Sequence, residues 1–141
     1  MPGPLTLYDE DFYLWTLKMA DVLRTGRLDE LDAEHLADEI EDMGKNNARE
    51  LESRITQILE HLLKLRLAQG LILEYNQNGW RASILRQKRE LASLLRQSPS
   101  LQRRVTPDFI QACYRDAAAT VSAEYRVEPP SECPFSPQEI L

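Results

Sequence analysis

The sequence has little of the chemistry that most enzymes and cofactor-binding proteins depend on. It holds only five glycines, two cysteines and two histidines in 141 residues. The glycines are isolated, so there is no glycine-rich phosphate loop, and no G-x-S-x-G nucleophile motif is present. Cys113 and Cys133 lack the spacing of a metal or redox motif. An enzyme is therefore unsupported rather than excluded, and we expect no cofactor and no metal.

Long apolar runs are also missing. No run of eighteen apolar residues could span a membrane, and the opening MPGPLTLYDEDF has neither the basic region nor the apolar core of a secretory signal. The two cysteines could pair, but two free thiols in a reducing compartment are the interpretation we favour. We therefore expect a cytoplasmic protein without membrane contact. Its length predicts a single domain, residues 1–141, with the tail 127–141 docked on it.

The two histidines do not form a metal site within one chain. On a continuous helix His35 and His61 would lie about 39 Å apart, from the rise of 1.5 Å per residue. Di-iron bundles use Glu-x-x-His pairs on different helices, and only Asp32-x-x-His35 comes near that pattern. Cys113 and His61 remain a theoretical nucleophile and base, as in any chain that holds both residues.

The most regular pattern lies in residues 33–67. Its apolar residues recur mostly at steps of three or four, which predicts one stripe along an α-helix. They are Leu36, Ile40, Met43, Leu51, Ile55, Ile58, Leu62 and Leu65. A stripe of this length must be covered by the rest of the chain. Gly44 is the one weak point, and the segment is either one bent helix or two helices over 33–43 and 46–68.

Three further helices and a proline-rich tail complete an all-α prediction, a helical bundle built on the long helix, which is either straight or kinked. Residues 8–23 form an aromatic-rich first helix that Gly26 ends in a left-handed conformation. Residues 71–79 are a connection, because Asn76, Asn78 and Gly79 disfavour helix, and 80–97 form the next helix. Thr106 and Pro107 open a helix to about residue 125. The proline-rich tail regains a turn at Ser136, and Pro130, Cys133 and Phe135 are expected to dock.

Two sets of polar residues are candidate functional sites. The first is a margin beside the apolar stripe of the long helix, at steps of four, three and four: Glu50, Arg54, Gln57 and His61. Glu50 and Arg54 have the favourable order of an ion pair. His61 could be a base or a metal ligand, but a hydrogen-bonded packing residue at a helix margin is the more common case. The clustered aromatics from Tyr8 to Trp15 are similarly either core anchors or a platform that stacks a ligand.

The second set is a basic helix face, comprising Arg81, Arg86, Lys88, Arg89 and Arg96. Charge is strongly segregated along the chain: residues 1–52 carry five Lys/Arg against fourteen Asp/Glu, and residues 53–104 carry ten against three. A basic face can bind nucleic acid. Pairing of this face with the acidic first third, within the chain or across a dimer, is the interpretation we favour.

Ordered blocks along nearly the whole chain resemble a bacterial family known as domain of unknown function twenty-nine, best known from cyanobacteria. The blocks are YDEDFYLW, GRLDELDAEHLADEIEDMG, RELESRITQILEHLLK, WRASILRQKRELASLL, SPSL, YRDA and CPFSPQEIL. The chain departs from the family pattern at Leu65, where an aromatic is usual, and at Gly79, where serine is usual. The resemblance implies an all-helical fold and no activity, cofactor or catalytic residue.

Three functions follow as hypotheses. The first is a non-enzymatic binding or regulatory protein that acts through a protein partner or self-association. The second is a small enzyme or metal-binding bundle centred on His61, Glu50 and the N-terminal aromatics. The third is nucleic-acid binding through the basic face. Segregated charge and the missing catalytic motifs favour the first.

Overall fold

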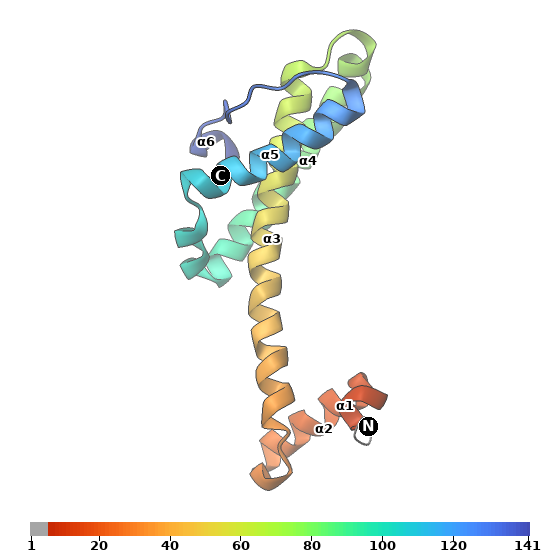
Figure 1. Ribbon diagram of the computed structural model, residues 1–141, viewed down its shortest axis with the longest axis vertical. Helices are drawn as coiled ribbons and strands as arrows, with labels where there is room; N and C mark the ends of the chain where they lie inside the picture. The colour runs from red at the N-terminus through yellow and green to blue at the C-terminus, as the bar shows by residue number, and fades with distance from the viewer. Residues whose placement is uncertain (1–5) are drawn as a thin grey trace. The chain divides into compact units, whose positions relative to one another are not determined.

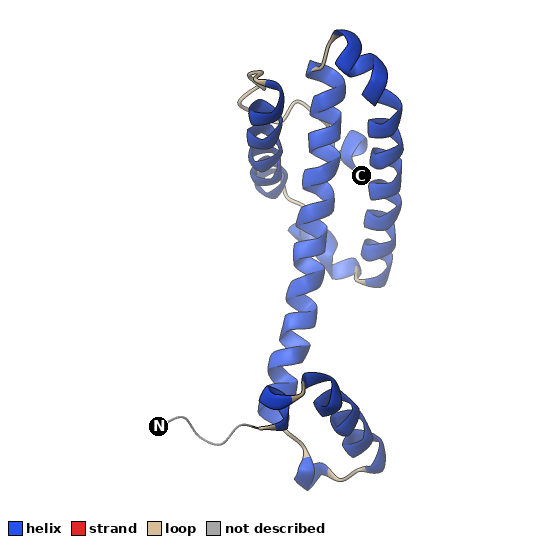
Figure 2. Ribbon diagram, turned by 90° about the vertical axis from the view of Figure 1, so that its right-hand side faces the viewer, coloured by secondary structure: helices blue, strands red, loops and turns tan. Residues whose placement is uncertain are grey.

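The computed structural model describes residues 6–141, and within them it contains helices and no strand, which confirms the all-α prediction (Figures 1 and 2). The expectation of no secretory signal rests partly on residues 1–5, which lie outside the described residues. No helix between residues 6 and 141 is long and apolar enough to cross a membrane. The chain divides into an N-terminal unit, Met1–Lys45, and a C-terminal unit, Asn46–Leu141.

The N-terminal unit contains α1 (Leu7–Glu10), α2 (Phe12–Thr25), the 3₁₀ helix η1 (Leu28–Glu30) and the first turns of α3 (Ala33–Leu67). Its small core holds Trp15, Met19 and Val22 from α2, with Leu31 and Leu36 packed against them among others. Gly26 ends α2 with φ 71°, which confirms the predicted left-handed stop. The predicted single helix over 8–23 is wrong, since α1 and α2 are separate.

Asp11 causes that break. Its backbone leaves the helical region at φ −151° and ψ 89°, and its side chain accepts a 3.0 Å hydrogen bond from the backbone N–H of Leu14. A short acidic side chain that bonds to a nearby backbone N–H competes with helix continuation and favours a new helix start. The helical periodicity of the side chains is the same on both sides of Asp11, so periodicity alone could not show the break.

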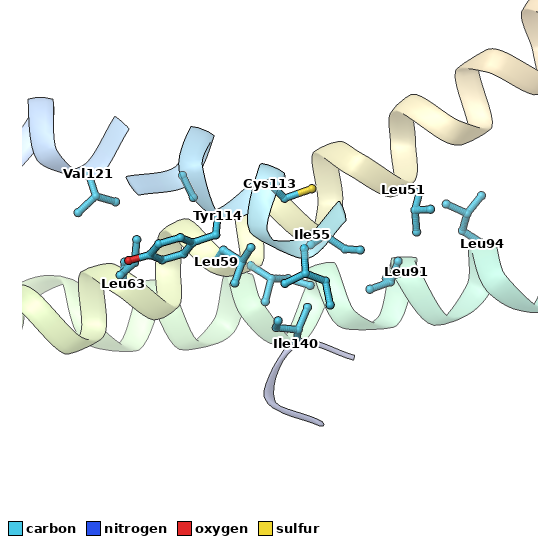
Figure 3. Packing of buried hydrophobic residues seen from close by; sticks show 13 residues of the cluster. Leu51, Ile55, Leu59, Leu63, Leu91, Leu94, Cys113, Tyr114, Val121 and Ile140 are labelled. Atoms are coloured by element: carbon cyan, nitrogen blue, oxygen red, sulfur yellow. The ribbon is translucent and has the colours of Figure 1, made fainter. Parts of the chain in front are cut away.

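The C-terminal unit is built from the rest of α3, α4 (Gly70–Gln97), the 3₁₀ helix η2 (Pro99–Arg104), α5 (Pro107–Tyr125) and α6 (Pro137–Ile140). Its core joins all the α-helices of the unit (Figure 3). Leu51, Ile55, Leu59 and Leu63 of α3 are fully buried there. Thr106 caps α5 and Pro107 begins it, as predicted.

Helix α3 runs without interruption through Gly44, so the alternative of two helices is wrong. The predicted connection over 71–79 is also wrong, because α4 begins at Gly70. Leu73 and Gln77 are partly buried and Trp80 is buried, at steps of four and three, so the inward stripe of α4 continues through the supposed connection. Burial along this stripe outweighs the weak helix propensity of Asn76, Asn78 and Gly79, about 1 kcal/mol for a glycine.

The tail lies against α5. The Tyr114 hydroxyl donates a 2.5 Å hydrogen bond to the Pro130 carbonyl, and the side chain of Gln111 bonds to the backbone of both Ser131 and Cys133. Ser136 caps α6, which places Ile140 in the core with no exposed surface. Figure 3 shows Ile140 reaching the cluster from the side opposite Cys113.

Candidate functional site

An apolar groove of about 360 Å³ lies in the N-terminal unit between α2 and the first turns of α3. Its lining is apolar apart from Thr16 and Glu39. The α2 residues are Phe12, Trp15, Thr16, Met19, Ala20 and Leu23, and the α3 residues are Leu36, Glu39, Ile40 and Met43. The spacing within each set is helical, so the groove is bounded by one face of each helix.

Several large apolar residues of the groove, of the kind usually buried in a core, are exposed to solvent. Ile40 is 65% exposed and Met43 is 68% exposed, while Phe12 and Leu23 are about half exposed. The prediction that the stripe of 33–67 is covered along its whole length is therefore wrong for Ile40 and Met43. Within the N-terminal unit the core reaches Leu36 of α3 and goes no further. An exposed row of large apolar side chains marks an interaction surface more often than a scattered single residue does.

A hydrogen-bonded aromatic cluster supports the groove from the side of α1. The Nδ1 atom of His35 lies 2.6 Å from Oδ2 of Asp32, and the same oxygen accepts a 3.2 Å bond from the Trp15 indole N–H. The Tyr8 ring stacks on His35 with centroids 3.9 Å apart and planes 7° apart. The Tyr8 hydroxyl donates to a Glu39 carboxylate oxygen. Trp15 of α2 and Glu39 of α3 belong to both the cluster and the groove. The hydrogen bonds of the cluster therefore hold one lining residue on each of the two helices.

Contacts within this cluster shift the pKa values of its titratable side chains. The hydrogen bond to Asp32 raises the pKa of His35, and the same bond lowers the pKa of Asp32. The bond to Glu39 is the largest cause that raises the pKa of Tyr8, to about 12. The aromatic residues between 8 and 15 differ in exposure: Trp15 is buried, Phe12 lines the groove, and Tyr13 is 73% exposed.

Three of the four residues of the predicted polar margin join a network between α3 and α4. Arg54 donates to Glu50 on its own helix over 3.0 Å and to the side-chain oxygen of Gln87 on α4 over 2.8 Å. Gln87 in turn donates to Gln57 over 2.8 Å. Gln87 is only 7% exposed. Its burial was not predicted, because a glutamine in a basic helix gives no sign of burial in the sequence.

His61 is separate from that network. Its Nδ1 atom lies 3.0 Å from the backbone carbonyl of Gln57 on its own helix, and burial is the main cause that lowers its pKa. It lines a pocket of about 520 Å³ with Glu52, Glu60 and other polar residues of α3, and with Asp116 of α5. Among residues 6–141 no hydrogen bond joins the His61 ring to a carboxylate or hydroxyl, and no three His, Cys, Asp or Glu side chains are placed to hold a metal.

The predicted basic face lies on α4 within the C-terminal unit. Arg81, Arg86, Arg89 and Arg96 are exposed and Lys88 is half-buried. In the part of the chain that the structure describes, none of these five side chains takes part in an ion pair. The pairing of this face with the acidic first third, within the chain or across a dimer, stays a prediction.

Large apolar residues share the outward side of α4 with those charges. Leu71 is 64% exposed, Tyr75 is 80% exposed and Leu85 is 53% exposed. Leu71 and Tyr75 were not predicted to lie on this face, because residues 71–79 were expected to form a connection. Once the segment is helical, steps of 100° per residue place these three residues on the side opposite the buried Trp80 and Leu91.

The family model described as Domain of unknown function DUF29 matches residues 7–141, essentially the whole chain. No curated protein and no solved structure matches the sequence.

Proposed function

The chain belongs to the family described as Domain of unknown function DUF29, and we propose that it is a helical protein-binding module whose N-terminal unit takes an amphipathic helix of a partner protein. The exposed apolar groove between α2 and α3 carries this proposal. A groove bounded by two helices suits a third helix, whose residues at i, i+3, i+4 and i+7 would fill it.

The charge around the groove supports a basic partner helix. Residues 1–45 hold four Lys/Arg against twelve Asp/Glu, a net charge of −8. Glu39 lines the groove, and Asp38, Glu41 and Asp42 are exposed on the same turns of α3. Among residues 6–141 none of these four carboxylates forms an ion pair. Lysines or arginines that flank the apolar row of a partner would complement them and raise the rate of association.

Two free cysteines support a cytoplasmic setting for this activity. Cys113 is buried and Cys133 is partly buried, and neither forms a disulfide. Burial raises the pKa of both thiols, which keeps them in the unreactive protonated form at neutral pH.

The proposal can be tested with a synthetic peptide. A fluorescently labelled amphipathic helix with leucine at the i, i+3, i+4 and i+7 positions and lysine elsewhere should bind the full chain in an anisotropy titration. Ile40→Lys places a charge in the groove and should weaken binding about tenfold or more, since burial of one such side chain is worth roughly 1.5–3 kcal/mol. A leucine–glutamate peptide with the same apolar row should bind much more weakly.

Leu28→Lys is the matched control, because Leu28 is 64% exposed, lies in the same unit and does not line the groove. It changes the net charge by the same amount as Ile40→Lys and should leave binding within about twofold. Equal losses in the two variants would show that the peptide responds to net charge alone. That result, or no binding to the unmodified chain, would contradict the proposal.

A further inference from the structure

We propose that the partner helix is α4 of a second copy of this chain, so that the acidic groove of one copy receives the basic outward face of α4 from another. This inference rests on the proposed function, because it names the occupant of the same groove. Both surfaces are complete within one unit of the chain, the groove in residues 12–43 and the helix face in residues 71–96.

The outward face of α4 has the apolar row that such a groove needs. Leu71, Tyr75 and Leu85 are all more than half exposed, and exposed Ala82 lies between the last two. Helical steps of three and four place Leu71, Tyr75, Ala82 and Leu85 on one stripe, in which Asn78 is the polar member. From residue 71 to residue 85 the stripe is about 21 Å long, at a rise of 1.5 Å per residue. The opposite face of α4 packs in the core through Leu91 and Leu94, so the helix is held folded while it presents this row.

Charge favours α4 over a neutral helix. Arg81, Arg86 and Arg89 are exposed around the row and form no ion pair in the described part of the chain. The groove carries Glu39, with Glu41 exposed one residue beyond Ile40. Residues 53–104 as a whole hold ten Lys/Arg against three Asp/Glu, opposite in sign to the N-terminal unit. Unlike charges at the rim of an apolar contact select the partner and its orientation.

Each copy holds one groove and one α4 face. Used reciprocally, the contact occurs twice in a two-fold dimer, the commonest symmetry of soluble oligomers. Two contacts also help the pair reach the 1,200–2,000 Å² of buried surface that is typical of a specific interface. The same surfaces therefore account for the segregated charge and for the exposed apolar residues on both α3 and α4.

The experiment is sedimentation velocity of the full chain over a concentration series at low and high salt. The unmodified chain should associate with increasing concentration, and more strongly at low salt. The groove variant Ile40→Lys/Glu41→Lys and the helix variant Leu85→Glu/Arg89→Glu should each associate at least about tenfold more weakly. An equimolar mixture of the two variants should regain association, because one contact is then unmodified and the other joins the new lysines to the new glutamates.

Two controls match these variants. Leu28→Lys/Asp29→Lys repeats the apolar-plus-acid change of the groove variant at exposed neighbours outside the groove. Ala119→Glu/Arg115→Glu repeats the i, i+4 charge change on the exposed side of α5. Both should associate within about twofold of the unmodified chain, and circular dichroism should show native helix content in all variants.

A chain that stays monomeric at every concentration and salt would overturn the inference. A mixture of the two variants that does not regain association would also overturn it. So would a change in sedimentation coefficient that is the same at every concentration in both variants, because that is the result expected of a contact within one chain. Binding of a short DNA duplex gives a further outcome. If the unmodified chain binds the duplex and Leu85→Glu/Arg89→Glu does not, while self-association is unchanged, the face would be assigned to nucleic acid instead. If the leucine–lysine peptide still binds the unmodified chain and Ile40→Lys still weakens that binding, the proposed function stands without this inference.

Discussion

The guanidinium of Arg54 donates a 2.8 Å hydrogen bond to the side-chain oxygen of Gln87, and this bond joins α3 to α4 in the C-terminal unit. The side-chain amide nitrogen of Gln87 donates a 2.8 Å hydrogen bond to the side-chain oxygen of Gln57 on α3. In the part of the chain that the structure describes, no buried side-chain nitrogen or oxygen lacks a partner. A network of this kind favours one register of the two helices, because any shift would leave buried polar groups unpaired.

Gln87→Leu should therefore destabilise the fold. The substitution removes the hydrogen bonds that Gln87 makes with Arg54 and Gln57. Because both partners are only partly buried, each lost bond should cost about 0.5–1.5 kcal/mol. The free energy of unfolding in urea measures the loss. Gln97→Leu, at the exposed last residue of α4, should change stability by less than about 0.5 kcal/mol. Equal effects of the two substitutions would show that the network contributes nothing.

The two histidines should titrate on opposite sides of the usual pKa of about 6.5. The bond to Asp32 raises the pKa of His35, and burial lowers that of His61. An NMR titration of the ring protons measures both values in one sample. Asp32→Asn should lower the pKa of His35 and leave that of His61 unchanged, so His61 is the internal control. Equal values for the two rings would contradict the prediction.

These shifts fix the direction of the pH dependence of stability. The pKa of His35 is raised on folding, so its contribution is complete below about pH 6.5 and is lost as the pH rises through the folded value. The pKa of Asp32 is lowered, so its contribution is present above the usual 3.8 and is lost as the pH falls through the folded value. His61 acts in the opposite sense to His35, because stability declines as the pH falls below about 6.5 and the unfolded ring takes up its proton first.

Ile140→Ala should cost about 2–5 kcal/mol, the range for a large aliphatic core residue cut to alanine. Ile140 is the last residue of α6 and is fully buried in the core of the C-terminal unit. Thermal unfolding followed by circular dichroism measures the effect. The neighbouring Leu141 is 40% exposed, and Leu141→Ala should have a much smaller effect. Similar losses for the two would mean that the tail is held by its backbone hydrogen bonds rather than by this side chain.

Gly44→Ala should stabilise the protein by about 0.5–1 kcal/mol, because Gly44 lies inside α3 and an added methyl group would meet nothing within 4 Å. Gly26→Ala should destabilise it by about 1–2 kcal/mol, since Gly26 has φ 71° and alanine is strained there. The melting temperatures of the two variants measure these opposite effects. A lower melting temperature for Gly44→Ala would show that α3 bends at this residue in solution.

Trp15 lies in the core of the N-terminal unit and Trp80 in the C-terminal unit, so each tryptophan reports on one unit. The single-domain prediction expects the two units to unfold together, because α3 is continuous through both. In Trp15→Phe and in Trp80→Phe, the fluorescence of the remaining tryptophan should follow the same urea transition as the helix content of that variant. Separate transitions would divide the chain into two domains.

The sequence alone determined the features that depend on neighbouring residues. The bounds of α3, the left-handed stop at Gly26 and the start of α5 at Thr106 and Pro107 were all predicted, because capping, dihedral preference and side-chain periodicity act over a few residues. The same local rules failed at Asp11, where a side-chain hydrogen bond separates two helices of equal phase. They failed again at Asn76 to Gly79, where burial along α4 outweighs weak helix propensity.

Only the tertiary structure decided which side chains are covered. Ile40 and Ile55 have the same place in the apolar periodicity of α3, yet Ile40 is 65% exposed and Ile55 is fully buried. The polar margin likewise divides, since Arg54 and Gln57 bond to Gln87 while His61 borders a pocket with Asp116. Burial depends on which distant segment packs opposite a residue, and periodicity gives the direction of a side chain but not what it meets. The candidate groove exists because α2 covers Leu36 and leaves Ile40 and Met43 open.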